Sequence, residues 1–380
     1  MDAGAGAKDA VGIGAPPLGP DASALVVDGG PRMLHTDRRR TNRAHGRGPA
    51  KPRVAWSVDV GGPVEAQVTT SPDETVLYVA SLGGSLRAIA RDGQVRWTLA
   101  LGDRIYATPC VADDGTIYVG VDGGHFAAVT PDGAIAWKLD VDGDADVAPA
   151  LTEGGTVVFA AGRTLYAVRR RGDVAWRYRA QGKIFTAPAI TDDGTVVVGA
   201  QDHHVHAVTP AGALAWSVDL GADVDGSPVV GDDGAVYVGT DAGDVVRLGA
   251  GGAIAWRAPL GGFVRGALSL GRDGSVLAGV YGPSPREVRV APDGRVLGAY
   301  AVPGTGAREF GVHGGALEDD DGTLYFGGQD DAVYAVARDG RLKWKFPTEG
   351  DVDAPMTLLS DGALVVSSDD GKVYLLAHEE

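Results

Sequence analysis

The sequence predicts an all-β protein, an eight-bladed β-propeller with four antiparallel strands in each blade. Three observations predict it: tryptophan recurs about every 40 residues, each period contains four short β-forming runs, and the runs at the two ends complement each other. The gaps between successive tryptophans are 41, 40, 39, 40, 40 and 88 residues. The last gap spans two periods and leaves Gly298 at the vacant register, which gives eight registers. The tryptophans are Trp56, Trp97, Trp137, Trp176, Trp216, Trp256 and Trp344.

One period shows the pattern of a blade. Residues 107–111, 116–121, 125–130 and 135–140 are apolar or alternating runs rich in β-formers. The turns between them read ADDG, DGG and PDGA, and glycine accepts the positive φ that a tight hairpin requires. The period therefore predicts four antiparallel strands, with the tryptophan in the outer one. Its fixed register indicates that the indole packs between blades.

The ends of the repeat predict how the ring closes. Residues 54–60 form a tryptophan strand with no three strands before it, and the last unit has only three runs, at 353–358, 363–368 and 372–377. We expect residues 54–60 to be the outer strand of the last blade, because this pairing removes an open sheet edge.

Composition limits the classes of function. The net charge of −16 argues against nucleic-acid binding and favours cationic ligands or basic partners. The only cysteine, Cys110, cannot form an internal disulfide, and no run is long enough for a transmembrane segment. Residues 1–30 are expected to be a flexible tether. A periplasmic, secreted or lipid-anchored location is favoured if an export signal has been removed, and a cytoplasmic one otherwise. We expect a monomer.

Residues 31–53 form a basic leader that contrasts with the acidic body at 54–377. We expect this leader to pack on the propeller's own negative surface; contact with nucleic acid or anionic lipid is the alternative. Its basic residues are Arg38, Arg39, Arg40, Arg43, Arg47, Lys51 and Arg53.

The repeat resembles a known family. The segments AVTPDGAIAW (128–137), AVTPAGALAW (207–216), AIARDGQVRW (88–97) and AVARDGRLKW (335–344), with preceding runs such as GTIYVGVDGG, are similar to the PQQ-like propeller repeat. That family includes quinoprotein dehydrogenases and BamB-type outer-membrane assembly proteins. The resemblance covers 54–377, although the turn is one residue shorter than usual and lacks its Asp and Thr. It implies a propeller fold.

The same resemblance assigns no catalytic residue. Quinoprotein dehydrogenases hold PQQ over a calcium ion, beside an adjacent-cysteine disulfide and a catalytic aspartate. This chain has no Cys-Cys pair and lacks their long insertions. PQQ is therefore not expected, and fold alone does not transfer activity.

Equivalent positions at the start of each blade should surround the axial mouth on one face of the ring. That face carries the variable connections, whereas the opposite face carries monotonous DDG and PDG turns. Such a ring suits a small ligand or a peptide tip, with solvation of the channel mouth as the alternative. The positions are Glu65, Tyr106, Asp146, Phe185, Asp225, Arg265, His313 and Asp353.

Two clusters raise the question of metal binding. Asp140, Asp142, Asp144 and Asp146 alternate on a glycine-containing loop that could bind Ca²⁺ through oxygen ligands, or could be a solvated acidic loop. His203, His204 and His206 follow one another closely, but the equivalent positions of other blades do not reinforce a site. Surface and packing roles are expected for these histidines.

The sixth period departs from the pattern. The turn at 280–286 and the connection at 302–315 lengthen on the same face, beside the register of Gly298. This irregular sector predicts a binding surface, with neutral loop growth as the alternative. Its contact groups would be Tyr281, Arg286, Arg308, Glu309, Phe310 and His313.

We therefore expect a non-catalytic scaffold that presents the mouth and the sector 280–315 to a protein or carbohydrate partner. The alternative is an enzyme, a lyase or hydrolase assisted by a divalent ion at the mouth, or a remnant that binds PQQ.

Overall fold

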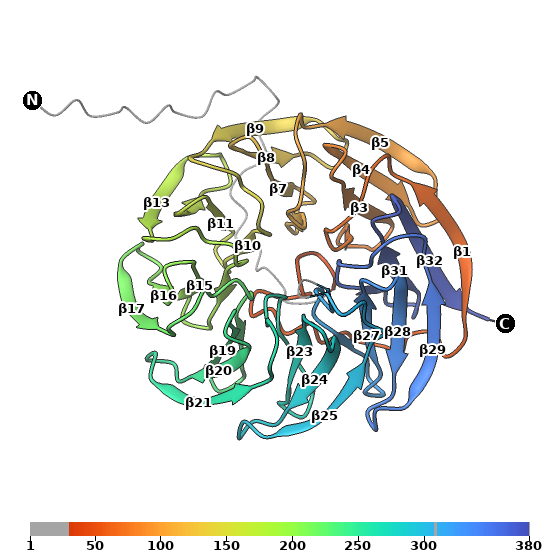
Figure 1. Cartoon of the computed structure of the whole chain (residues 1–380). Helices are drawn as coiled ribbons and strands as arrows, with labels where there is room; N and C mark the ends of the chain where they lie inside the picture. Colours follow the sequence, from red (N-terminus) through yellow and green to blue (C-terminus); the bar gives the residue numbers. More distant parts are fainter. Residues whose placement is uncertain (1–29, 308–309, 380) are drawn as a thin grey trace, which may run out of the picture.

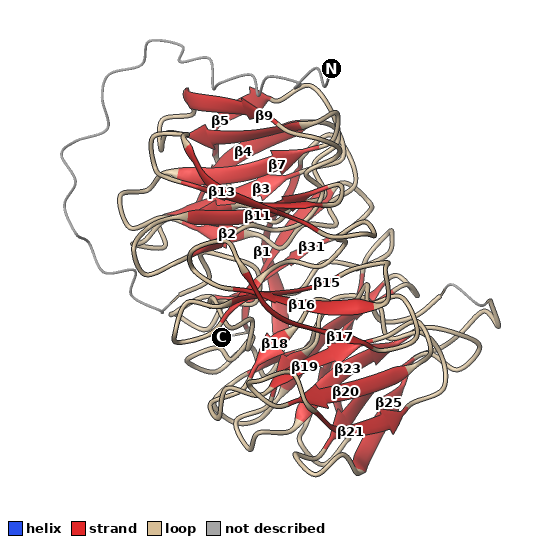
Figure 2. Ribbon diagram, turned by 90° about the vertical axis from the view of Figure 1, so that its left-hand side faces the viewer, coloured by secondary structure: helices blue, strands red, loops and turns tan. Residues whose placement is uncertain are grey.

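The computed structural model describes residues 30–307 and 310–379. The described chain folds into eight four-stranded antiparallel sheets arranged in a ring, which confirms the predicted eight-bladed propeller (Figure 1). Figure 2 shows the same ring from the side, with strands and loops only. No helix long and apolar enough to cross a membrane occurs in the described part.

Each blade runs from its innermost strand to its outer strand. Blade 1 contains β2 (Thr69–Thr70), β3 (Val76–Ala80), β4 (Ser85–Ala90) and β5 (Val95–Ala100); blade 2 contains β6 (Cys110–Val111), β7 (Ile117–Val121), β8 (His125–Val129) and β9 (Ile135–Asp140). Blade 3 contains β10 (Ala150–Leu151), β11 (Val157–Ala161), β12 (Thr164–Val168) and β13 (Val174–Arg179); blade 4 contains β14 (Ala189–Ile190), β15 (Val196–Gly199), β16 (His204–Val208) and β17 (Leu214–Asp219). Blade 5 contains β18 (Val229–Val230), β19 (Val236–Gly239), β20 (Asp244–Leu248) and β21 (Ile254–Pro259); blade 6 contains β22 (Ser269–Leu270), β23 (Val276–Val280), β24 (Arg286–Val290) and β25 (Val296–Ala301). Blade 7 contains β26 (Leu317–Glu318), β27 (Leu324–Gly328), β28 (Ala332–Val336) and β29 (Leu342–Pro347); blade 8 contains β30 (Thr357–Leu358), β31 (Leu364–Ser367), β32 (Lys372–His378) and β1 (Pro52–Asp59).

The ring closes between the two ends of the repeat. β1 pairs antiparallel with β32, with Pro52 opposite His378 and Asp59 opposite Lys372. The N-terminal strand is thus the outer strand of the last blade, as predicted, and the two lie side by side in Figure 1. This pairing covers an edge that β32 would otherwise expose.

The tryptophans join neighbouring blades. The indole of Trp97 lies on Gly133 of the next blade, whose φ of +87° allows the tight turn there, and its Nε1 donates to the carbonyl of Pro131 at 2.9 Å. Trp344 donates instead to Pro49 of the leader at 2.7 Å, because no covalent turn joins β32 to β1. The other five tryptophans donate to Arg91, Arg170, Pro210, Ala250 and Pro292.

The leader runs across the centre of the ring and hydrogen-bonds to the innermost strands. The amides of Thr70 and Val111 donate to leader carbonyls 31 and 32, and those of Ile190, Val230 and Leu270 donate to carbonyls 38, 39 and 41, at 2.7–2.9 Å. The short innermost strands thereby gain a backbone partner on the side facing the axis.

Leader arginines also pair with carboxylates of the face that carries the DDG turns, which we call the turn face. The pairs are Arg32 with Asp113, Arg38 with Glu153 at 2.8 Å, Arg39 and Arg43 with Asp232 at 3.3 and 3.0 Å, and Arg47 with Asp321 at 3.0 Å. The opposite face, with the connections between blades, is called the loop face.

Arg40 lies fully buried at the centre of this arrangement. Its guanidinium donates to the carbonyls of Leu34 at 2.8 Å, Pro149 at 2.9 Å and Pro188 at 3.1 Å. Burial lowers the pKa of Arg40 to about 10, so the group stays charged at neutral pH. Arg40 thus holds the leader against blades 3 and 4.

The contact between blades 6 and 7 is built differently. Gly298 pairs with Arg289 in the register where Trp97 pairs with Ala88. With no indole there, the half-buried Arg289 forms an ion pair with the buried Glu318 of blade 7 at 2.7 Å. An ion pair thus joins blades 6 and 7, whereas a tryptophan joins each of the other pairs of neighbouring blades.

Glu287 lies two residues before Arg289 and is 3% exposed. Neither carboxyl oxygen has a hydrogen-bond partner among the described residues. Burial raises the pKa of Glu287 to about 8, although the charge of Arg289 lowers it. The corresponding residues of blades 1 and 3 are Leu86 and Leu165.

Replacing Arg40 should destabilise the protein far more than replacing its neighbour. Arg40→Ala leaves several buried carbonyls without donors, so we expect the free energy of unfolding to fall by about 3 kcal/mol or more. Arg39→Ala removes only ion pairs with exposed carboxylates and should cost less than about 1 kcal/mol. Denaturant unfolding measures both, and equal losses would contradict a central role for Arg40.

Glu287→Leu should stabilise the protein, with a larger gain at pH 8 than at pH 5. Between the ordinary pKa of 4.5 and the raised value of about 8, the unfolded chain loses the proton of Glu287 while the folded chain keeps it, so wild-type stability falls as pH rises. At pH 8 we expect a gain of about 1–3 kcal/mol in thermal or urea unfolding. Glu287→Gln should flatten the same pH dependence, and an unchanged profile would contradict the raised pKa.

Candidate ligand-binding site at the axial mouth

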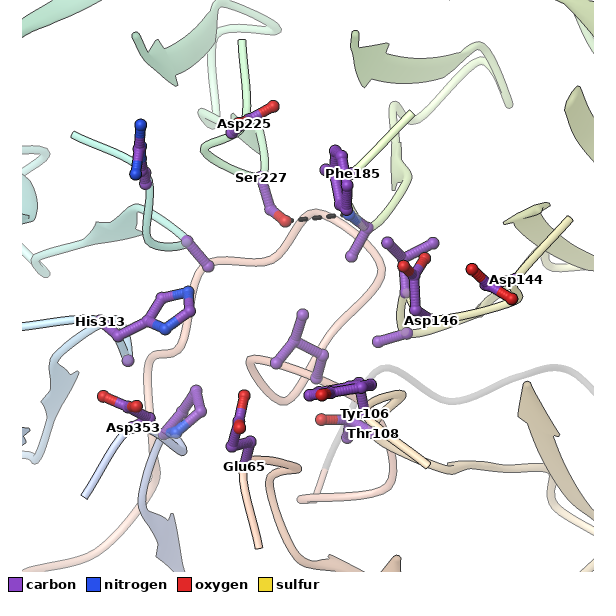
Figure 3. A pocket seen from close by; sticks show the side chains of 18 of the residues that line it. Glu65, Tyr106, Thr108, Asp144, Asp146, Phe185, Asp225, Ser227, His313 and Asp353 are labelled. Carbon is purple, nitrogen blue, oxygen red and sulfur yellow. Dashed lines mark hydrogen bonds between the residues drawn. The ribbon is translucent and has the colours of Figure 1, made fainter. Parts of the chain in front are cut away.

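A cavity of about 750 Å³ opens at the axis on the loop face (Figure 3). All eight mouth positions taken from the repeat line it: Glu65, Tyr106, Asp146, Phe185, Asp225, Arg265, His313 and Asp353. Leu34 lines it from the leader, whose residues His35, Arg40 and Asn42 are completely buried. The leader therefore closes the inner end, and the cavity is a blind cup.

Three mouth residues, Asp225, Arg265 and Asp353, contact a side chain that follows the second strand of the preceding blade. The side chain of Gln201 donates to Asp225 at 3.3 Å, and that of Gln329 donates to Asp353 at 3.2 Å. The same geometry with reversed charge joins Arg265 to Asp241 at 2.8 Å. In these three pairs the two side chains are 24 residues apart in the sequence and join successive blades.

Carboxylates outnumber cations in the cup. Six carboxylates line it, namely Glu65, Asp122, Asp144, Asp146, Asp225 and Asp353, against three cations, Arg104, Lys183 and Arg265. Each cation has an acidic partner: Arg104 pairs with Asp122 at 3.4 Å, Lys183 with Asp146 at 2.8 Å, and Arg265 with Asp241. The cup therefore presents a surplus of negative charge.

The ring closure between blades 8 and 1 brings like charges together. Burial and the charges of Asp369 and Asp353 raise the pKa of Glu65 to about 7, although Arg104 lowers it. Burial and the charges of Asp353 and Asp351 raise the pKa of Asp369 to about 7. Both groups therefore change protonation near neutral pH.

Several mouth carboxyls are only half satisfied. One oxygen each of Asp146, Asp225 and Asp353 accepts a hydrogen bond, while the other is buried without a partner among the described residues. Burial raises the pKa of Asp225 to about 6, although its hydrogen bond from Gln201 lowers it. Such half-satisfied acceptors favour a ligand that brings hydrogen-bond donors.

Aromatic rings line the cup between the carboxyls. Phe185 is 38% exposed, an unusual exposure for a phenylalanine, and Lys183 Nζ lies 3.8 Å from its ring centroid. Tyr281 packs edge-on against His313, with ring centroids 5.6 Å apart. The cup thus offers aromatic faces next to acidic groups, a combination that suits organic cations.

Among the described residues of the irregular sector, Tyr281, His313 and Gly314 line the cup. Tyr281 also pairs with Phe263 and Gly311 in isolated bridges. Arg286 donates instead to the carbonyls of Ser284 and Leu260 and lines no part of the cavity. Phe310 is half-buried, and its carbonyl accepts a hydrogen bond from Gly282 at 3.0 Å. Arg308 and Glu309 lie outside the described residues.

The four aspartates of the acidic loop separate. Asp144 and Asp146 line the cup, where Asp144 accepts a hydrogen bond from the amide of Gly123 at 3.2 Å. Asp140 ends β9 opposite His125, and Asp140 and Asp142 are exposed. Within residues 30–307 and 310–379, no three His, Cys, Asp or Glu side chains are arranged to hold a metal ion.

The histidine cluster has a packing explanation in the structure. His206 is buried between Tyr178, whose hydroxyl lies 2.9 Å from its Nδ1, and Asp202, 3.1 Å from its Nε2. Tyr334 with Asp330 and Tyr374 with Asp370 form the same contact in blades 7 and 8.

Sequence reasoning missed the partners of the mouth residues and the floor. Gln201, Gln329, Asp241 and Asp369 follow the second strands, and the constant spacing of 24 residues to the mouth position was a signal that could have identified three of them. Leu34 lies outside the repeat, so no periodicity pointed to it.

Comparisons with known proteins agree with this architecture. A family model described as outer membrane protein assembly factor BamB matches residues 48–146, 124–207 and 201–305. A search of the curated proteins found no match.

Solved structures share the fold. BamB from Moraxella catarrhalis is 20% identical with a TM-score of 0.70, over 87% of this chain and 100% of that one. A europium-containing methanol dehydrogenase is 11% identical with a TM-score of 0.77, over 92% and 98%. The quinohemoprotein alcohol dehydrogenase from Comamonas testosteroni is 13% identical with a TM-score of 0.76, over 93% and 81%.

The three family matches together run without a break from residue 48 to residue 305, which is well over half of the chain. The chain therefore belongs to the PQQ-like propeller family described as outer membrane protein assembly factor BamB.

Proposed function

We propose that this protein is a non-catalytic binding module whose axial cup receives a cationic tip, a lysine or arginine side chain on a protruding loop of a partner protein. One observation carries the proposal: the cup is blind, aromatic-walled and holds six lining carboxylates against three cations that already have acidic partners. A cation entering it gains both Coulomb attraction and ring contacts.

The family supports a protein partner. The matched family is described as an assembly factor, and BamB from Moraxella catarrhalis is among its structural neighbours. In this proposal, Tyr281 and His313 extend the contact from the cup toward the irregular sector. The sector residues Arg286 and Phe310 would then meet the partner outside the cup.

PQQ does not fit this cup. The quinone cofactor carries carboxylate groups, and among the described residues each cation that lines the cup, Arg104, Lys183 and Arg265, already pairs with an aspartate. Burying further carboxylates beside Glu65, Asp225 and Asp353 would be unfavourable. We derive no redox step for this protein.

A second candidate is an enzyme that uses Glu65, which lines the cup, as a general acid or base. It is favoured by the pKa of Glu65, which burial raises to about 7, a value that suits proton transfer at neutral pH. Metal analysis of the purified protein separates the two candidates: a stoichiometric divalent ion that is lost from Glu65→Gln would favour the enzyme.

Neutralising the mouth should weaken binding of a cationic probe. The probe is an acetylated and amidated Gly-Ser-Lys-Ser-Gly peptide, with its glutamate counterpart as the negative comparator. Asp225→Asn together with Asp353→Asn should weaken its affinity at least about tenfold in calorimetric titration, and added salt should weaken wild-type binding. Asp140→Asn, on an exposed strand end outside the cup, is the matched control. Equal affinity of all three proteins would reject the cup as the binding site.

Binding should strengthen as the pH rises from 6 to 8. Glu65 and Asp369 are largely protonated below pH 7 and ionise above it, which adds negative charge to the cup. Titrating the lysine peptide at a series of pH values measures the effect. Glu65→Gln with Asp369→Asn should flatten the curve, and a wild-type affinity that falls over this range would contradict the assignment.

A further inference from the structure

A second cleft lies between blades 3 and 4 and opens on the turn face, away from the axial cup. Its volume is about 590 Å³. Its apolar wall is formed by Val158, Ala167 and Trp176, and its polar rim includes Thr152, Glu153 and Asp193. The binding role proposed for the cup does not involve this cleft.

The repeat shows what fills the equivalent space in other blades. In every blade, three residues lie in a row across the second, third and outer strands. In blade 1 they are Tyr78, Ala88 and Trp97, with Tyr78 opposite Ala88 and Ala88 opposite Trp97. The middle residue is a small alanine in blades 1, 2 and 7, whereas in blade 5 it is Arg247.

Four blades share this ring contact. The tyrosine and tryptophan centroids are 5.8–6.0 Å apart in blades 1, 2, 5 and 7. The pairs are Tyr78 with Trp97, Tyr118 with Trp137, Tyr237 with Trp256, and Tyr325 with Trp344. A phenol ring against the indole is therefore the preferred filling of this row.

Blade 3 keeps the row but lacks the ring. Val158 pairs with Ala167, and Ala167 pairs with Trp176, in the same register as the tyrosine-containing blades. These three residues are the apolar wall of the cleft. Val158 and Ala167 are fully buried at the inner end of the cleft, and the half-buried indole of Trp176 lacks the phenol contact that the tyrosine-containing blades have. Blade 8 closes its own row with Leu375, which lies opposite Val365 and Trp56.

The polar rim of the cleft also offers hydrogen-bond partners for a phenol hydroxyl. The hydroxyl of Tyr325 donates to Asp319 at 3.0 Å, and the hydroxyl of Tyr237 accepts from Arg247 at 3.2 Å. In blade 3 the residue at the register of Asp319 is Thr152, followed by Glu153. A hydroxyl on the incoming ring would meet acceptors at the same end of the row.

We propose that this cleft binds a phenol ring, the tyrosine side chain of a partner peptide, in the position that Tyr78 and its equivalents occupy in other blades. The ring would stack beside Trp176, with its hydroxyl directed to Thr152 and Glu153. Because the cleft lies on the turn face, its occupant is independent of the ligand in the axial cup.

The test uses 4-methylphenol, the side chain of tyrosine, with toluene as the comparator that lacks the hydroxyl. We expect 4-methylphenol to shift the NMR signal of the Trp176 indole N–H and to bind more tightly than toluene. Val158→Tyr supplies the ring from within, and Ala167→Leu fills the row as blade 8 does. Both variants should lose binding while their melting temperatures stay at or above that of the wild type.

Val197→Tyr is the matched control, because blade 4 carries the same row with Val197, Ala207 and Trp216. It should leave the response of Trp176 unchanged. Retained binding in folded Val158→Tyr or Ala167→Leu would overturn the proposal, as would equal affinity for toluene. If Val158→Tyr fails to fold, Ala167→Leu alone decides.

Discussion

The contact between neighbouring blades is the interaction on which the rest of this structure depends. Each sheet presents two apolar faces, and only the adjacent sheets can cover them. Clusters such as the one from Tyr78 and Ala88 of blade 1 to Ile117 and Val129 of blade 2 recur around the ring. A ring of this kind is complete only when its ends meet, which is why the pairing of β1 with β32 matters to every blade.

The leader provides a second closure, along the axis rather than around it. The innermost strands are two residues long, so they offer few hydrogen bonds of their own. The leader supplies acceptors to blades 1, 2, 4, 5 and 6 and anchors itself through the buried Arg40. Burying the guanidinium of Arg40 costs desolvation free energy, and hydrogen bonds to several carbonyl acceptors offset this cost. The consequence of the leader for the cavity is that it closes the inner end, with Leu34 in the lining.

The charged and aromatic side chains of the candidate sites lie at positions where the blades differ from one another. Mouth residues occupy one repeat position yet differ in almost every blade, so a regular backbone displays an irregular set of charges and rings. Blade 6 has Gly298 at the position of the tryptophan. The ion pair between Arg289 and Glu318 joins blades 6 and 7 there in place of the indole contact. Val158 in blade 3 and Val197 in blade 4 stand where four other blades have a tyrosine.

Much of this could be derived from the sequence, because the repeat encodes contacts that are local in each blade. The spacing of tryptophans determined the number of blades, and the orphan strand at 54–60 determined the closure. The eight mouth positions also followed from the register, since equivalent positions in a ring must surround the axis. The repeat did not indicate that Arg286 donates to the carbonyls of Ser284 in its own blade and Leu260 at the end of blade 5, because several acceptors lie within reach of a long side chain.

Tertiary structure decided the rest, for one physical reason: these features depend on contacts between residues far apart in the chain. The path of the leader depends on which carbonyl acceptors surround Arg40, and these come from blades 3 and 4. Burial in the folded ring is the largest cause of the raised pKa values of Glu65 and Asp369, and for Glu65 the closure adds the charges of Asp369 and Asp353 from the last blade. The sequence by itself determined the ring and the positions on it, whereas folding decided the floor of the cup and the protonation of its wall.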